Sequence, residues 1–253
     1  MAQPVCQFTL GAKDVHVWRA SLDHTADIVE RLRQLLSADE HVRASRFHFE
    51  RDRQHFVVGR GCLRIIISRY LKIPPAEIQF SYGINGKPQL ATANALIQPF
   101  HFNLAHSGSR ALYAFTRVGE IGVDLESIRP DFTGDDIAQR FFSPREVASL
   151  NELSPELRHA AFFNCWTRKE AFIKAIGIGL SLSLDQFDVT LGPSEPAELL
   201  RTRWDESEAS RWSLKAIDVG SDYVAAVAVA AQGWHLTCAD VEKEGLLVFG
   251  DER

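Results

Sequence analysis

The stretch Trp166-Thr167-Arg168-Lys169-Glu170-Ala171-Phe172-Ile173-Lys174-Ala175-Ile176-Gly177 is the most informative part of this chain. Trp166, Glu170 and Lys174 stand four residues apart, so on a helix they lie close to one stripe of the surface. Phenylalanine and isoleucine between them supply apolar surface for packing. The pattern predicts a helix that carries polar chemistry on one side. A solvated Glu-Lys pair at i,i+4, which is common on helices, is the plain alternative.

A second acidic motif lies upstream, in Ile121-Gly122-Val123-Asp124-Leu125-Glu126. The run is typical of a strand, and residues i and i+2 of a strand point to the same face. Asp124 and Glu126 would repel each other there unless a cation, a proton or a basic side chain lies between them. The alternative is a strand end whose polar residues are simply solvated.

The two motifs together indicate a site for a metal ion and a phosphate. Mg²⁺ prefers oxygen ligands and takes only a few of them from protein, the rest coming from water and substrate phosphate. Glu170 offers a third carboxylate beside Asp124 and Glu126, and Lys174 follows one helical turn later. We therefore expect these four side chains to meet.

Composition limits the classes of function. The chain has 253 residues, of which 45% are hydrophobic and 24% charged, as expected for a soluble globular protein. A formal net charge of −5 argues against a nucleic-acid binder with a broad basic surface. The longest apolar run, 223–231, is too short to span a bilayer, and the N-terminus lacks a signal peptide pattern. Four scattered cysteines without zinc spacing favour a reduced, cytoplasmic location.

The order of the predicted elements favours an α+β fold. Helices are expected over 22–36, from Ser37 through Phe47, over 51–71 and from Ser154 to Gly177, with a further capping box at 143–146. Strands are expected over 15–18, 78–82, 100–104, 111–116, from Ile121, and over 186–191, 212–219 and 223–230. Strands joined by hairpins with inserted helices argue against a doubly wound parallel sheet. The two halves have a similar order of elements and divide near Gly119, residues 192–210 are expected to form a surface loop, and the tail after Val241 to be poorly ordered.

Several basic groups are candidates for contact with an anionic ligand. They are Arg46, Arg51, Arg53, Arg60 and Arg64 near the start of a long helix, Lys87 in the turn Gly86-Lys87-Pro88, His106 in Asn103-Leu104-Ala105-His106-Ser107-Gly108, and Lys169 with Lys174. At least two of the five arginines are expected to be no more than a solvated helix face. No P-loop or dinucleotide-binding glycine motif occurs.

Four of these blocks, in this order, resemble the 4′-phosphopantetheinyl transferases of the surfactin-synthetase-activating (Sfp-like) type. They are Gly86-Lys87-Pro88, Phe102 to Gly108, Ile121 to Glu126, and Trp166 to Gly177 followed by Gly179-Leu180. The resemblance implies a monomer of two similar α/β subdomains, 1–118 and 119–253, related by a pseudo-twofold axis. Coenzyme A would bind between them.

The resemblance also assigns the residues of the site. Asp124, Glu126 and Glu170 match the family's Mg²⁺ carboxylates, and Lys174 matches its helix lysine. Lys87 and His106 match contacts to the phosphates of coenzyme A, and Arg53 and Arg60 match the basic side chains near its 3′-phosphate. Ala105 departs from the serine of many members, so a hydroxyl contact to the ligand would be missing.

The implied reaction is transfer of the 4′-phosphopantetheine arm of coenzyme A to a serine of an apo acyl or peptidyl carrier protein, with release of 3′,5′-ADP. Mg²⁺ would hold the pyrophosphate and polarise the phosphoryl group under attack. Glu170 would accept the serine proton, directly or through water, while Lys174 would stabilise or protonate the leaving group. A role for Glu170 as metal ligand alone remains open at this point.

Three other readings compete with this one. A Mg²⁺-dependent phosphohydrolase acting on a nucleotide would use the same carboxylates with water as the nucleophile. An inactive module that binds coenzyme A or a nucleotide would not need all of Asp124, Glu126, Glu170 and Lys174. A structural interaction protein would leave the clustered carboxylates unexplained.

Docking of the carrier protein needs a local feature of the surface. Carrier proteins of the family are acidic helical bundles, and this chain is itself net negative, so an apolar or basic patch must bring the two together. Phe132, Phe141 and Phe142 lie between the two acidic motifs in the sequence. We expect at least one of them to be exposed beside the metal site.

Overall fold

The computed structural model describes residues 8–83, 86–91, 99–129 and 134–249. The first half contains β1 Asp14–Ser21, α1 Ala26–Arg33, α2 Ala38–Ser45, α3 Glu50–Leu71, η1 Pro75–Glu77, β2 Phe80–Tyr82, β3 Pro88–Leu90, β4 His101–Ser107 and β5 Arg110–Thr116. The second half contains β6 Ile121–Ser127, α4 Asp135–Phe141, α5 Pro144–Glu152, α6 Pro155–Ile176, η3 Gly179–Ser181, η4 Leu184–Gln186, β7 Phe187–Val189, β8 Leu199–Thr202, α7 Glu208–Arg211, β9 Ser213–Ala216, β10 Tyr223–Val229 and β11 His235–Asp240.

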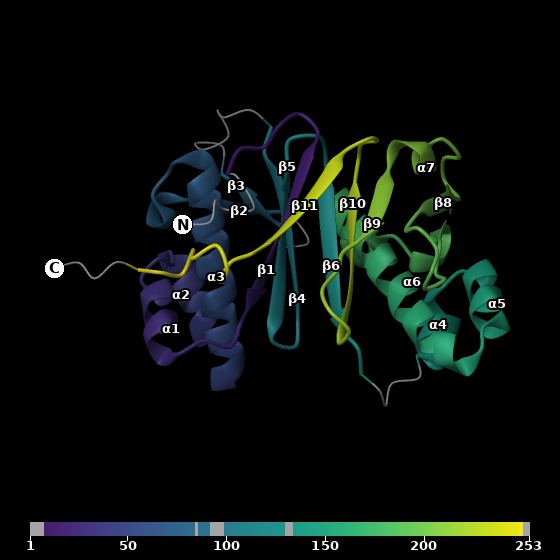
Figure 1. Ribbon diagram of the computed structural model, residues 1–253, viewed down its shortest axis with the longest axis horizontal. Coiled ribbons are helices and arrows are strands. Elements are labelled where there is room, and N and C mark those ends of the chain that lie inside the picture. The colour runs from purple at the N-terminus through teal and green to yellow at the C-terminus, as the bar shows by residue number, and fades with distance from the viewer. Residues whose placement is uncertain (1–7, 84–85, 92–98, 130–133, 250–253) are drawn as a thin grey trace.

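The two halves repeat one architecture, as Figure 1 shows. Each begins with a strand, continues with two short helices and a 22-residue helix, and then adds a two-stranded hairpin and two further strands. The strand order is β1-β5-β4 in the first sheet and β6-β10-β9 in the second. The predicted α+β class with two similar subdomains is confirmed. Each long helix covers the outer face of its own sheet, so the molecule has four layers.

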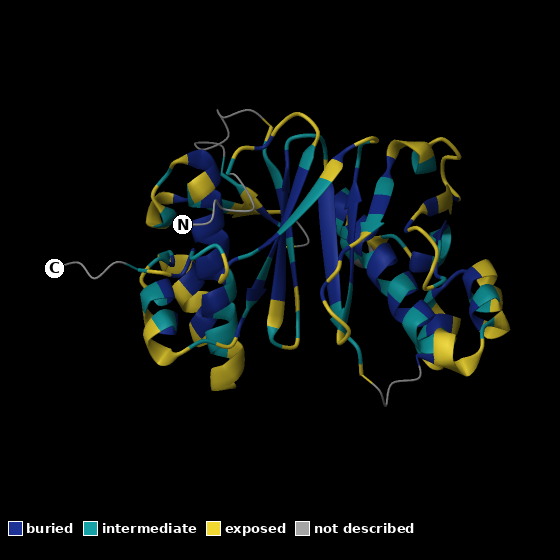
Figure 2. Cartoon of the chain, viewed as in Figure 1, coloured by how far each residue is buried: buried dark blue, intermediate teal, exposed yellow. Residues whose placement is uncertain are grey.

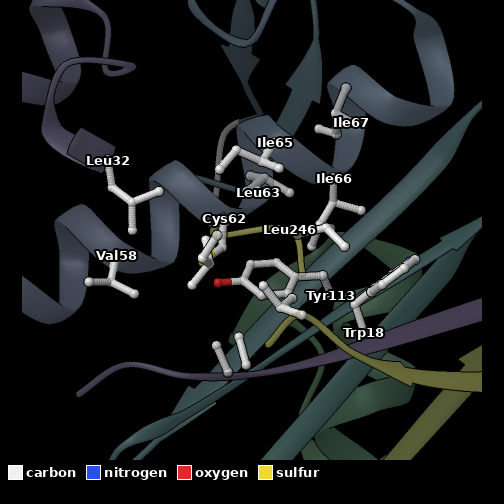
Figure 3. Close-up of a cluster of buried hydrophobic side chains, with 14 of the residues drawn as sticks. Trp18, Leu32, Val58, Cys62, Leu63, Ile65, Ile66, Ile67, Tyr113 and Leu246 are labelled. Carbon is white, nitrogen blue, oxygen red and sulfur yellow. The ribbon is translucent and has the colours of Figure 1, made fainter. Parts of the chain in front are cut away.

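Three apolar cores lie between these layers. One joins α1, α2 and α3 to the first sheet and contains Trp18, Leu63, Ile66 and Tyr113 (Figure 3). A second joins the two sheets, with Val17, Val123 and Val227 among its members. The third joins the second sheet to α4, α5 and α6. Both sheets are therefore covered on both faces, and Figure 2 shows the central strands β5 and β6 as largely buried, whereas β11 is mostly intermediate.

Helix α6 begins and ends where its sequence predicts. Ser154 adopts an extended N-cap conformation, and Pro155 occupies the first helical position, where its missing N–H costs nothing. Gly177 ends the helix in the left-handed conformation with φ of 80°. A matching start occurs in α5, where Ser143 and Glu146 form the predicted capping box.

The last strand returns to the first half of the molecule. β11 pairs in parallel with β1, so the first sheet gains a fourth strand from the C-terminal segment. Leu246 and Leu247, which follow it, are buried against the first core. The expected poorly ordered tail after Val241 is therefore wrong as far as 249. Among the described residues, no helix is long and apolar enough to cross a membrane.

Candidate active site

Strand β6 separates its two faces as its sequence predicts. Ile121, Val123 and Leu125 enter the core between the two sheets, so Gly122, Asp124 and Glu126 face the other way, towards α6. The approach to α6 is close, because a Cβ added at Gly122 would lie 2.1 Å from the carbonyl oxygen of Ala171. Glycine thus lets the carboxylate strand lie directly against the helix that carries Glu170 and Lys174.

Asp124 and Lys174 form the central contact of the site. Lys174 Nζ donates to Asp124 Oδ1 at 2.5 Å. The Asp124 side chain is buried, whereas that of Lys174 is partly exposed. Burial raises the pKa of Asp124 to about 7, the Lys174 ammonium opposes the shift, and the negative charges of Glu126 and Glu170 add to it.

Two further carboxylates stand beside this pair. Burial, and secondarily the charge of Glu126, raises the pKa of Glu170, while Lys174 acts in the opposite direction. No hydrogen-bond or ion-pair partner holds the Glu170 carboxylate in the described part of the chain. Glu126 accepts a hydrogen bond from Ser107 Oγ at 3.1 Å. The structure therefore brings the four residues predicted from the two motifs into one electrostatic cluster.

The cluster has the chemistry that a hard cation requires. Asp124 Oδ2 is buried and lacks a hydrogen-bond partner, which is costly unless another group satisfies it. Over the described ranges, however, no three His, Cys, Asp or Glu side chains form a ready-made metal site. Lys174 lies on the other oxygen of Asp124. The donor set thus fits Mg²⁺ in kind, with the Lys174 ammonium as the cation now present.

Two adjoining cavities meet at the cluster. The larger, of about 570 Å³, lies between α3 and the hairpin β4–β5. The smaller, of about 270 Å³, lies between the turn that precedes β3, strand β4 and the end of α6. Lys174 and Leu104 line both of them. An extended ligand that occupies both cavities would therefore pass the carboxylates. The larger cavity is lined by several basic groups, including Arg43, His55, Arg60 and His106.

The predicted arginine contacts differ in their placement. Arg60 lines the larger cavity, is almost wholly buried and lies 3.7 Å from Glu40. Its Nη1 is buried without a hydrogen-bond partner. Arg53 pairs with Glu50 at 2.8 Å and does not line the cavity. Of the two, Arg60 is the one that the structure brings to the site.

Lys87 reaches the site from the hairpin β2–β3, but its ammonium is engaged by the protein. Its Nζ donates to the carbonyl oxygens of Lys174 at 2.8 Å, of Ala175 at 3.2 Å and of Ile121 at 3.2 Å. Desolvation lowers its pKa, and Glu120 opposes the shift. Lys87 therefore ties the first half of the chain to the end of α6 and the start of β6. Its expected phosphate contact stays a prediction.

His106 lies at the mouth of the larger cavity, where desolvation and then the charge of Lys174 lower its pKa. Sequence reasoning missed His55, which lines the same cavity and contacts Asp23 at 2.7 Å. The spacing on α3 could have identified it, because Asp52, His55, Phe56, Gly59 and Arg60 share one helix face. Arg43, on the preceding helix α2, was missed as well.

Two other basic candidates are structural, so their predicted contact with an anionic ligand is wrong. Lys169 is fully buried, where it pairs with Glu146 at 2.8 Å and donates to two carbonyl oxygens. Arg64 is also fully buried and donates to Glu40 at 2.7 Å and to the carbonyl oxygens of Pro75 and Ile78. Each charge is paired inside its own core.

The phenylalanines proposed for docking are mostly packed. Phe142 is buried against Phe162, and Phe141 is partly buried against Trp166. Phe132 lies outside the described residues. An exposed phenylalanine beside the carboxylates is therefore not found at Phe141 or Phe142.

The duplicated α+β fold places a cluster of carboxylates and basic groups beside two adjoining cavities. The model of the 4′-phosphopantetheinyl transferase superfamily matches residues 120–228. The model of the 4′-phosphopantetheinyl transferase N-terminal region matches residues 17–117. The two matches together span both halves.

Similar proteins carry the same activity in their names. The chain is 41% identical over 226 residues to the 4′-phosphopantetheinyl transferase HetI of Nostoc sp., covering 89% of this chain and 92% of that protein. It is 34% identical over 162 residues to the 4′-phosphopantetheinyl transferase Sfp of Bacillus subtilis, covering 64% and 69%. Among solved structures, the holo-[acyl-carrier-protein] synthase of Helicobacter pylori in complex with coenzyme A is 23% identical, with a TM-score of 0.32, covering 44% of this chain and 99% of that chain.

The chain belongs to the 4′-phosphopantetheinyl transferase superfamily and is of the Sfp type. It is a transferase that moves the 4′-phosphopantetheine arm of coenzyme A to carrier proteins. The transferase reading thus replaces the phosphohydrolase, the inactive binding module and the structural protein as alternatives.

Proposed function

We propose that transfer takes place at the Asp124, Glu126, Glu170 and Lys174 cluster, on coenzyme A bound across the two adjoining cavities. The observation that carries this proposal is the buried, unpartnered Oδ2 of Asp124 beside Lys174. A buried carboxylate with a free oxygen is unfavourable for the empty fold. A cation bound with the ligand could satisfy this free oxygen.

Asp124, Glu126 and Glu170 would hold Mg²⁺, which supports the proposal by satisfying the free carboxylate oxygen. When bound, the ion neutralises the pyrophosphate and polarises the phosphoryl group under attack. Lys174 pairs with Asp124 in the site without a metal ion. In the reaction, its ammonium would stabilise the charge that develops on the leaving 3′,5′-ADP. Arg60, with its free Nη1, is suited to the 3′-phosphate.

Glu170 is the group best suited to accept a proton from the serine of the carrier protein. Burial raises the pKa of Glu170 in the site without a metal ion, and the carboxylate lies on the helix face that meets the cluster. It has no other partner in the described residues. Asp124, in contrast, is paired with Lys174 at 2.5 Å and is less free to act as a base.

The expected partner is an apo acyl or peptidyl carrier protein. We propose that the transferase works as a monomer in the cytoplasm, with residues 1–118 supplying contacts to coenzyme A and residues 119–253 supplying the carboxylates. The division is supported by the separate helix layers of the two halves, although β11 joins the first sheet.

Mass spectrometry of a panel of apo carrier proteins, incubated with coenzyme A and Mg²⁺, tests the proposal. Glu170→Gln and Asp124→Asn should abolish the mass increase that marks the attached arm. Glu156→Gln, on the exposed first turn of the same helix, is the matched control and should transfer normally. Normal transfer by Asp124→Asn would contradict the proposed site.

Coenzyme A binding separates the two roles of Glu170. If Glu170 is a base only, Glu170→Gln should bind coenzyme A in Mg²⁺ as tightly as the unaltered protein while losing turnover. If Glu170 is a metal ligand, the Mg²⁺-dependent part of the affinity should fall as well.

A further inference from the structure

Along one edge of β6, side chains of β4 accept the hydrogen bonds that the backbone of a paired strand would otherwise accept. β6 pairs with β10 on one edge, and β4 lies along the other edge without belonging to the same sheet. Asn103 Oδ1 accepts the N–H of Val123 at 3.0 Å, and Ser107 Oγ accepts the N–H of Ser127 at 3.0 Å. The first half of the chain therefore fixes the carboxylate strand through these two side chains.

The Ser107 hydroxyl accepts one hydrogen bond and donates a second one to Glu126. A backbone N–H can only donate, so Ser107 Oγ is the acceptor towards Ser127 and keeps its own hydrogen for another partner. That hydrogen is directed to Glu126 Oε2, at 3.1 Å. The donor and the acceptor of both hydrogen bonds are therefore fixed: Ser127 N–H donates to Ser107 Oγ, and the Ser107 hydroxyl donates to Glu126 Oε2.

We propose that Ser107 is a positioning residue for the transfer reaction, because it orients the Glu126 carboxylate towards the Mg²⁺ complex of coenzyme A. The inference rests on the proposed function, in which Glu126 is a metal ligand. Carboxylates that bind metals are commonly oriented by such outer hydrogen bonds, and removing one typically costs about 10–100-fold in metal affinity. Glu126 is only partly buried and would otherwise sample several rotamers.

Asn103 provides the internal comparison. It makes the same kind of contact to the β6 backbone as Ser107 does. In the described part of the chain, however, its side-chain NH₂ group donates no hydrogen bond to a carboxylate of the cluster. A purely structural role for Ser107 would require only the contact to Ser127.

The experiment measures coenzyme A binding by calorimetry, with and without Mg²⁺, in the absence of any carrier protein. Ser107→Thr and Ser107→Val form a matched pair, since the two side chains have nearly the same shape, both suit a strand, and only threonine keeps the hydroxyl. Ser107→Ala is the simple deletion, and Ser109→Ala, in the same hairpin, is the control. Circular dichroism establishes that each variant is folded.

The Mg²⁺-dependent gain in affinity should fall about tenfold or more in Ser107→Val and Ser107→Ala, and should persist in Ser107→Thr and Ser109→Ala. Affinity without Mg²⁺ should stay the same in all four. An undiminished gain in Ser107→Val, or an equal loss with and without Mg²⁺, overturns the inference. Absence of any Mg²⁺-dependent gain in the unaltered protein would instead contradict the proposed metal site.

Discussion

Asp124 and Lys174 are joined by only one of the two oxygens that the carboxylate offers. Lys174 Nζ lies 2.5 Å from Oδ1, while Oδ2 is buried without a partner. The ammonium compensates part of the buried charge but leaves the rest unfavourable. The site therefore holds a destabilising feature that a bound cation can relieve.

Asp124→Asn should stabilise the fold and abolish transfer. The neutral amide has nearly the same shape and removes the buried negative charge, while Lys174 is exposed enough to be solvated. We expect a gain of about 1–2 kcal/mol at pH 7, below the roughly 4 kcal/mol that a pKa shift of this size represents, since the lysine contact is lost. This corresponds to about 2–4 °C in Tm per kcal/mol for a chain of this size. Thermal unfolding without Mg²⁺ measures it.

The gain should depend on pH in a defined direction. The pKa of Asp124 is raised from 3.8 to about 7 on folding, so its contribution to stability is fully present below pH 3.8 and is lost as pH rises to about 7. The stability difference between Asp124→Asn and the unaltered protein should grow from pH 4 to pH 7 and then level off. A difference that is constant across this range would show that Asp124 is already ionised in the fold at low pH.

Gly122→Ala should be severely destabilising, because the added Cβ would lie 2.1 Å from the Ala171 oxygen and 2.3 Å from the Ala175 nitrogen. Both atoms are backbone, so β6 and α6 must separate. We expect a loss of about 3 kcal/mol or more in the free energy of unfolding, at the upper end of overpacking effects. Denaturant unfolding measures the loss.

Gly59→Ala in α3 is the matched control, since a Cβ there meets no atom closer than 3.8 Å. That change should be neutral or stabilising by about 0.5–1 kcal/mol, as expected inside a helix. If the two alanines had equal effects, the close approach of β6 to α6 would not be what requires glycine at position 122.

Much of the fold follows from local sequence signals. Both ends of α6 and the start of α5 were predictable, because capping residues, proline and glycine act within a few residues of a helix end. The shared face of Asp124 and Glu126 follows from the two-residue period of a strand. The strand period and the helix period each place two site residues on one face, so the sequence could predict which side chains of each motif would face the site.

Features set by distant contacts were not predictable. β11 pairs with β1 across more than 200 residues, and nothing local to 235–240 indicates that partner. Residues 192–210, expected to be a loop, contain β8 and the start of α7. Lys87 was expected to face a ligand, but its ammonium binds carbonyl oxygens that only the folded second half brings near. Arg64 and Lys169 were likewise candidates for contact with an anionic ligand, and their burial in the protein depends on tertiary packing.

Lys87→Met should lower the thermal stability of the protein. The change keeps the aliphatic stem and removes the ammonium that binds carbonyl oxygens at the end of α6, where a positive charge also favours the helix dipole. A loss of about 1–3 kcal/mol is expected. Thermal unfolding and calorimetry with coenzyme A, both on the same preparation, distinguish the structural role from phosphate binding. Weaker coenzyme A binding at unchanged Tm would assign Lys87 to the ligand instead.

Ala105→Ser should add a third hydrogen bond between β4 and β6. Ala105 lies between Asn103 and Ser107 on the same face of β4 and is buried in the core between the sheets. Backbone N–H groups alternate along a strand, so Leu125 N–H points to β4 like those of Val123 and Ser127. Among the described residues no acceptor serves this buried amide.

A serine hydroxyl at position 105 could accept from Leu125, so the variant should be more stable by about 0.5–1.5 kcal/mol. Ala114→Ser is the control, because Ala114 is buried in the same core but lies on β5 instead of β4. Its buried hydroxyl should cost about 1–3 kcal/mol. Thermal unfolding compares the two variants, and slower hydrogen exchange at the Leu125 amide would report the new bond directly. If Ala105→Ser destabilised the protein as much as Ala114→Ser, the Leu125 amide would not be available to β4.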